Sequence, residues 1–158
     1  MSRKLCDSFL SQFQSTWDML DEALEGINKE KWITEIDGWT YADVIYHIII
    51  TQEFYIRDTP KGMKWGELYG SPDLKTSRPR DYYPKKETLL IYLEEVKNSV
   101  ENYLLSIKDE DLCKSDGFKE HLSSIHKKLL YLLRHNAHHL GELALMHRIH
   151  KLEKVEWR

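Results

Sequence analysis

The sequence predicts an all-α protein: a single domain over residues 1–158, folded as a four-helix bundle. Four long segments each carry apolar residues at three- and four-residue steps, which is the spacing of one buried face on a helix. All four prolines and three of the seven glycines fall within residues 60–84, so the rest of the chain is nearly free of helix breakers. A length of 158 residues supports one core and not comfortably two. Amphipathic helices of this kind bury their apolar faces against one another in a bundle.

The first predicted helix runs from about Arg3 to Gly26. Seven apolar residues form its stripe: Cys6, Phe9, Phe13, Trp17, Leu20, Leu24 and Ile27. Residues 28–38 are then expected to connect this helix to the second one.

The second predicted helix begins after Thr40 and ends near Arg57. Thr40 has the position of an N-cap, and Asp43 follows three residues later, a pattern that resembles a capping box. The β-branched run Ile48–Ile50 is typical of a strand, but the cap and the length of the flanking apolar pattern favour a helix.

The third predicted helix has the most regular pattern, and Pro84 stands where a helix begins. Its stripe is formed by Leu89, Leu93, Val96, Val100, Tyr103 and Ile107. The long irregular segment before it, residues 58–83, permits a crossover connection in place of simple up-down order. Residues 109–117 are expected to form a polar connection after it.

The fourth predicted helix extends from about His121 to His150. Its apolar stripe includes Ile125, Leu129, Leu132, Leu143 and Met146. His135 and His139 occupy the middle positions of the same stripe, so their imidazoles are expected to point toward the core.

Three histidines form a candidate metal site. His135 and His139 are four residues apart, which places both on one face of a helix, and His47 recurs at helical spacing in an apolar run, so it can face the same interior. A metal ion would satisfy one nitrogen of each buried ring and keep a position open, as in catalytic zinc sites. The alternative is that each imidazole hydrogen-bonds to a carbonyl or a tyrosine in the core. The pair plus a third inward-facing histidine favours the metal.

The residues around this pair allow several interpretations. Glu142 is an acceptor for a histidine ligand, a general base for metal-bound water, or an exposed carboxylate. His138 is expected to flank the site. At Gly141 we expect close approach of another helix or a ligand, rather than an exposed position without a role. The other histidines are expected to be solvated or helix-end residues: His121, His126, His147 and His150.

Charge and missing motifs exclude several classes of function. The net charge of −3 gives no electrostatic case for nucleic acid, and no apolar stretch approaches the roughly 20 residues of a membrane span. The N-terminus has no apolar leader core, so we expect a cytoplasmic protein.

Cys6 and Cys113 form no CxxC pair and are expected to be reduced, which excludes a cysteine-based zinc site. The patterns of di-iron bundles, zinc proteases, phosphate loops and serine hydrolases are absent. Three aromatic residues at helical spacing are expected to belong to the core: Trp17, Tyr103 and Tyr131.

Two motifs resemble those of the DinB/YfiT-like superfamily of metal-dependent enzymes. The first is Gly-Trp-Thr at residues 38–40, followed seven residues after the threonine by His47. The second is His-x-x-x-His-x-Gly-Glu-Leu at residues 135–143. Their order and spacing cover essentially the whole chain, and the closing Val-Glu-Trp-Arg is similar to the family's usual tail.

The resemblance implies a bundle in up-down-down-up order, with the crossover between the second and third helices. It implies a divalent ion, zinc or nickel, held by His47, His135 and His139, and a homodimer in many members. Characterised relatives include transferases and isomerases that use small cellular thiols. Leu140 stands where many relatives have a basic residue.

The leading hypothesis is a metal-dependent enzyme that acts on a small molecule, as a transferase of a low-molecular-weight thiol or as a hydrolase, because zinc activates both thiols and water. The alternative is a non-catalytic, metal-stabilised helical module for binding or stress response. Residues 58–83 are about twice the usual loop length and are expected to form a lid. Candidate lid residues are Tyr69, Arg80, Tyr82 and Tyr83.

Overall fold

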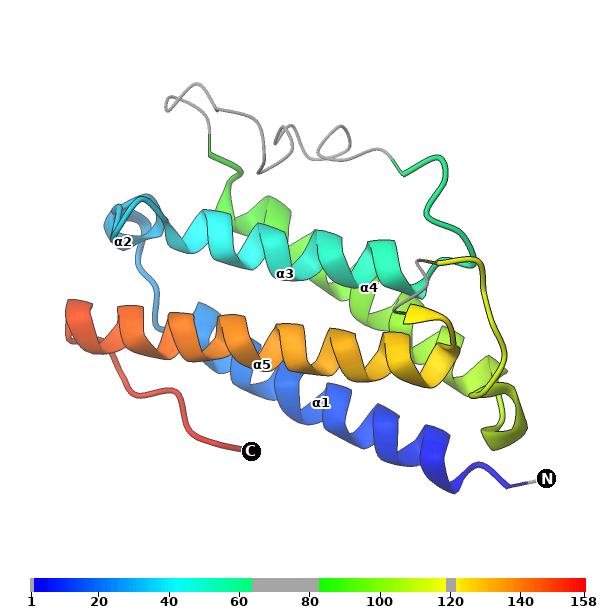
Figure 1. Ribbon diagram of the computed structural model, residues 1–158. Helices are drawn as coiled ribbons and strands as arrows, with labels where there is room; N and C mark the ends of the chain where they lie inside the picture. Colours follow the sequence, from blue (N-terminus) through cyan, green and yellow to red (C-terminus); the bar gives the residue numbers. More distant parts are fainter. Residues whose placement is uncertain (1, 64–82, 119–121) are drawn as a thin grey trace.

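The computed structural model describes residues 2–63, 83–118 and 122–158. Over these residues the elements are α1 (Lys4–Glu25), α2 (Lys29–Trp32), α3 (Tyr41–Ile56), α4 (Lys86–Ser106), the 3₁₀ turn η1 (Asp109–Asp111) and α5 (Ile125–His150). Helices α1 and α3 each pack against both α4 and α5. Figure 1 shows α1 and α5 running in one direction and α3 and α4 in the other, which is up-down-down-up order. The predicted four-helix bundle is therefore confirmed.

A tight turn and a capping box fix the start of α3. Asp37 and Gly38 have positive φ values of 50° and 84°, and Ile36 and Trp39 on either side exchange both backbone hydrogen bonds. Glycine adopts such a φ without strain, which explains its place in the Gly-Trp-Thr motif. The Thr40 hydroxyl then accepts the Asp43 N–H, and the Asp43 carboxylate accepts the Thr40 N–H. The predicted capping box is therefore confirmed.

Helix α3 is the most deeply buried element. Every residue from Tyr41 to Gln52 is buried except His47, which is half-buried. The buried Gln52 amide oxygen accepts a hydrogen bond from the Trp17 indole at 2.9 Å, which satisfies a polar group that would otherwise be costly to bury. His47 is therefore the place where α3 presents a polar side chain at the edge of the core.

The structure corrects three element boundaries. The predicted connection at residues 28–38 contains the one-turn helix α2, whose cap Asn28 accepts the Lys31 N–H at 2.9 Å. The polar connection at residues 109–117 begins with η1. Helix α5 begins at Ile125 rather than near His121, because the N–H groups of Ile125 and His126 bond to carbonyls of the preceding segment. Periodicity alone carries no signal for such contacts with a distant segment.

The C-terminal tail, residues 151–158, returns along the bundle from the end of α5 (Figure 1). Lys151 ends α5 in the left-handed conformation with φ 55°. The Glu22 carboxylate on α1 then accepts hydrogen bonds from the Glu156 N–H and from Arg158, both at 3.2 Å. These contacts hold the tail against α1.

The described residues bear on two further expectations, which concern a membrane span and the cysteines. Among them, no helix has both the length and the apolar character needed to cross a membrane. Cys6 is buried, Cys113 is exposed, and both thiols are free.

Candidate metal centre

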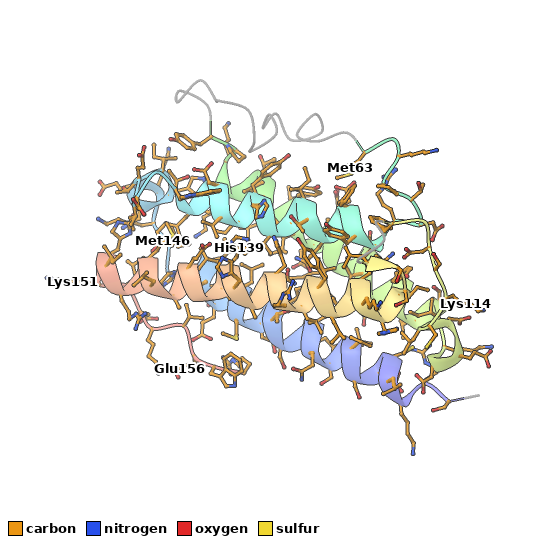
Figure 2. All side chains as sticks on the ribbon, in the orientation of Figure 1. Met63, Lys114, His139, Met146, Lys151 and Glu156 are labelled. Atoms are coloured by element: carbon orange, nitrogen blue, oxygen red, sulfur yellow. The ribbon has the colours of Figure 1, made fainter. Side chains whose placement is uncertain are left out.

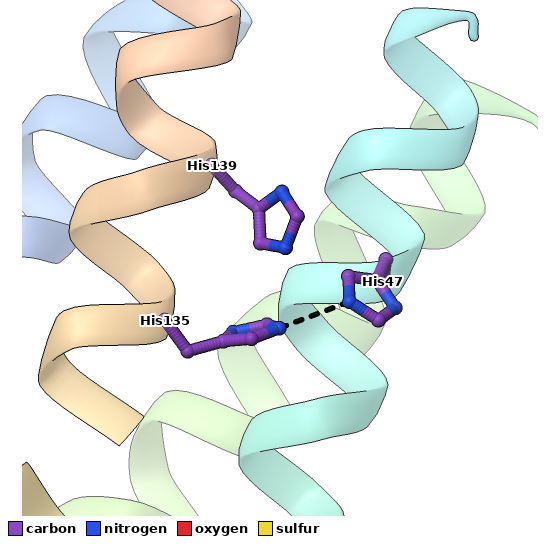
Figure 3. Close-up of side chains that lie close together, drawn as sticks. All are labelled: His47, His135 and His139. Carbon is purple, nitrogen blue, oxygen red and sulfur yellow. Dashed lines mark hydrogen bonds between the residues drawn. The ribbon is translucent and has the colours of Figure 1, made fainter. Parts of the chain in front are cut away.

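The three predicted histidines meet between α3 and α5. The Nε2 atoms of His135 and His47 lie 2.9 Å apart (Figure 3). The ring centroids of the three imidazoles are separated by 4.5 to 4.8 Å. One ligand atom from each ring lies within 4.8 Å of the other two. Rings drawn from helices far apart in the sequence therefore converge on one point.

The cluster lies at the edge of the core rather than inside it. His47 and His135 are half-buried, and the His139 side chain is 13% exposed. Asn136 and Leu140 occupy the middle of the buried face on α5 instead. The buried face is therefore centred one residue later along the helix than predicted, and His135 and His139 lie at its edge. Figure 2 shows His139 halfway along α5, between α5 and α3. The described helices therefore shelter the three rings only in part.

The electrostatic surroundings keep His135 neutral. Burial, followed by the nearby His139 and His47 rings, lowers the pKa of His135 to about 3. A neutral imidazole keeps one nitrogen lone pair, which is the form that binds a metal. Two nitrogens bound tetrahedrally to zinc lie about 3.3 Å apart. The 2.9 Å between the two Nε2 atoms is within a few tenths of an ångström of this value, so the donor set fits a divalent ion.

Glu142 orients one of the rings. Its Oε2 atom lies 2.6 Å from His139 Nδ1, which makes Nδ1 the protonated nitrogen and leaves the Nε2 lone pair for the cluster. Its other oxygen lies 3.4 Å from Nε2 of His138, whose side chain is 68% exposed. The structure therefore brings Glu142 and His138 to the border of the cluster. Among the described residues, His138, His139 and Glu142 form a second group that could hold an ion.

Polar atoms beside His135 lack partners within the described part of the chain. His135 Nδ1 and both amide atoms of Asn136 are buried without a hydrogen bond. Such atoms are rare in folded proteins, and a bound ion is one explanation for them.

An aromatic wall adjoins the cluster on the His135 side. The Tyr131 ring stacks on His135 with centroids 6.2 Å apart, and Tyr55 lies against Tyr131 at 5.0 Å. Burial, followed by the neighbouring Tyr131, raises the pKa of Tyr55 to about 12, so its hydroxyl stays protonated. Tyr131 was expected to belong to the core, and Tyr55 was missed. A signal for Tyr55 existed, because residues eight apart on a helix share a face and Tyr55 lies eight residues after His47.

At Gly141 the expected approach of another helix is wrong, because a Cβ there would meet no described atom within 4 Å. The alternative, close approach of a ligand at Gly141, stays a prediction. Close approach occurs instead at Gly26, where a Cβ would lie 3.3 Å from the ring of His147. His147 was expected to be a solvated or a helix-end residue. It does stand in the last turn of α5, but it is not solvated: it is 1% exposed and its Nδ1 donates to the Glu153 carbonyl at 2.9 Å.

The expected lid falls largely outside the described residues. This applies to residues 64–82, including Tyr69, Arg80 and Tyr82, and also to His121. Tyr83 is described: it is partly buried against the core and borders a cavity beside Trp32 and Lys86.

The fold and the cluster together define a helical bundle in which imidazoles from two facing helices converge, and bundles build their metal sites from side chains placed in this way. A sequence profile of the DinB superfamily matches residues 12–143. The chain therefore belongs to the DinB superfamily, as its motifs predicted. No curated protein and no solved structure matches the chain.

Proposed function

We propose that this protein is a metal-dependent enzyme acting on a small molecule, with a divalent zinc or nickel ion held by His47, His135 and His139. One observation carries the proposal: three imidazoles offer ligand atoms within 4.8 Å of one another. Three nitrogen ligands leave a coordination position for a substrate, as in catalytic sites. The DinB superfamily assignment supports the same conclusion.

The bound ion would act as a Lewis acid toward a thiol or water, and the same three ligands serve thiol transfer and hydrolysis equally. Glu142 is proposed as a positioning residue. Its carboxylate accepts the Nδ1 proton of His139 and so aims Nε2 at the cluster. This contact favours the acceptor role of Glu142 over that of a general base, because the carboxylate oxygen at 2.6 Å is already engaged.

The substrate is proposed to be a small molecule with an apolar portion. Tyr131 and Tyr55 would hold that portion, because their rings continue the wall of the site beyond His135. A low-molecular-weight thiol as co-substrate and a homodimeric assembly are further proposals, which rest on resemblance to the family.

Metal analysis of the purified protein tests this proposal. We expect about one zinc or nickel ion per chain, and a loss of at least tenfold in bound metal for His139→Ala. His138→Ala separates the two groups of ligands: it should keep the metal if the three-histidine site holds it, and lose it if the ion sits instead on His138, His139 and Glu142. If no metal copurifies and added zinc does not bind, the proposal is wrong.

Circular dichroism during chelation separates a functional site from a structural one. A fold that survives metal removal supports the enzyme, whereas a fold that melts supports the non-catalytic, metal-stabilised module. Activity assays should then pair several low-molecular-weight thiols with electrophilic acceptors, and test small esters and amides as hydrolysis substrates.

A further inference from the structure

A second cavity lies on the opposite side of α5 from the histidines. Its volume is about 520 Å³, within the range of about 300–1,000 Å³ typical of small-molecule sites. It lies between α1 and α5, and Val155, Trp157 and Arg158 of the C-terminal tail border it. Its apolar lining includes Met19, Leu133, Ala137, Leu140, Val155 and Trp157. Because a full helix width separates this cavity from the imidazoles, it is a separate site.

The cavity extends along α5, and small side chains line its middle. Its lining on α5 extends from Leu130 to Ala144, a distance of about 21 Å at 1.5 Å per residue. Ala137 and Gly141 lie in the middle of this stretch, and a Cβ at Gly141 would meet no described atom within 4 Å. The wall therefore has room for an extended apolar chain along α5.

The charged side chains that line the cavity are all positive. Two arginines, Arg134 and Arg158, line the cavity, and no Asp or Glu side chain of the described residues lines it. Arg158 is paired with Glu22 at 3.2 Å. Arg134 lies over the Tyr131 ring at 5.5 Å and makes no ion pair with any described residue. An adjoining shallow depression shares Arg134 and adds Lys127. A positive group without a counter-charge therefore stands beside an apolar cavity.

We propose that this cavity binds an amphipathic monocarboxylate. The carboxylate pairs with the guanidinium of Arg134, whose planar donors match a carboxylate in a two-point contact. The hydrocarbon chain lies along α5 over Ala137 and Gly141, where it covers Leu133, Leu140 and Met19. This inference does not depend on the metal centre, because the two sites use opposite faces of α5.

Isothermal titration with octanoate and with 1-octanol tests the proposal, because the two probes share a chain and differ in charge. In the unsubstituted protein we expect octanoate to bind at least tenfold more tightly than 1-octanol. Arg134→Gln should bring the two affinities within about twofold. Gly141→Trp should fill the cavity and abolish the binding of both probes. Ile91→Trp, at a 61% exposed position on α4, is the control and should leave both affinities unchanged.

Three outcomes would overturn the proposal. The first is equal affinity for octanoate and 1-octanol in the unsubstituted protein. The second is octanoate binding that survives both Gly141→Trp and a second filling variant, Ala137→Phe, with circular dichroism verifying that each variant is folded. The third is a dimer in velocity sedimentation that Gly141→Trp dissociates while octanoate does not bind, which would assign the cavity to a second copy of the chain.

Discussion

Helix α5 contributes to two groups of histidines with different surroundings, one at its middle and one at its C-terminal end. In the middle group, the rings of His135, His139 and His47 face one another, with two Nε2 atoms 2.9 Å apart. In the end group, His147 and His150 pack on Tyr41, with ring centroids 5.5 and 5.7 Å away. Both groups join α5 to α3.

The partners of the ring nitrogens separate the two groups. His147 donates Nδ1–H to the Glu153 carbonyl, so its ring ties the C-terminal tail to the end of α5. In the middle group the nitrogens face other nitrogens and a carboxylate, which is the setting of a ligand set. Burial alone does not mark a functional histidine, because His147 of the end group is more buried than the histidines of the middle group.

The largest expected effect is on stability at the end group. His147→Ala should lower the free energy of unfolding by about 2–4 kcal/mol, because it leaves a cavity against Tyr41 and removes the donor to the Glu153 carbonyl. In metal-free protein, His139→Ala should cost less than about 1 kcal/mol, because that ring lies at the edge of the core. Urea unfolding measures both values. Equal losses in the two variants would remove the distinction between the groups.

The next effect concerns metal affinity at the middle group. Glu142→Gln should weaken zinc binding about 10- to 100-fold, since the amide holds the proton of His139 Nδ1 less strongly than the carboxylate does. Competition titration against a chelating dye measures the dissociation constant. Glu156→Gln, on the tail, is the matched control and should bind zinc as the unsubstituted protein does. An unchanged affinity in Glu142→Gln would show that the 2.6 Å contact does not orient the ligand.

A smaller effect concerns Tyr41, whose hydroxyl is buried without a partner among the described residues. Tyr41→Phe should change the free energy of unfolding by no more than about 1 kcal/mol at pH 7. Burial raises the pKa of Tyr41 to about 12, above the ordinary value of 10.0. The unfolded chain therefore loses this proton first, and stability that is complete below pH 10 is lost as the pH rises through 12.

Tyr41→Phe should accordingly lose less stability than the unsubstituted protein between pH 9 and pH 11. Urea midpoints at the two pH values measure the difference. Parallel losses in both proteins would mean that the Tyr41 hydroxyl reaches water or a polar partner in solution.

The smallest effect is at Gly141, which lies between the two groups. Gly141→Ala should raise the free energy of unfolding by about 0.4–1 kcal/mol and leave zinc binding unchanged, because an exposed helical glycine gains from a methyl group that meets nothing. Gly26→Ala is the control, and it should lack this gain because its methyl group would lie 3.3 Å from His147. Loss of stability in Gly141→Ala would indicate a contact at this face in solution.

Much of the fold could be predicted from local pattern. The stripe on α1 and the capping box at Thr40 were readable because both arise from residues close in sequence. The metal candidates were readable too, since the four-residue spacing of His135 and His139 sets a shared face. The start of α5 could not be predicted from local pattern, because the hydrogen bond from the Ile125 N–H to the Lys114 carbonyl depends on how a separate segment folds back.

The amino-acid order alone decided which side chains share a helix face, where α3 is capped and which histidines could converge. Those properties follow from the fixed geometry of a helix and from contacts within a few residues. Tertiary packing decided that His135 and His47 meet nitrogen to nitrogen, that His147 finds a carbonyl beyond the turn at Lys151, and that Gly141 borders a cavity. The physical reason is that periodicity gives the direction of a side chain from its own helix, whereas the partner it meets depends on the rotation and separation of the neighbouring helix.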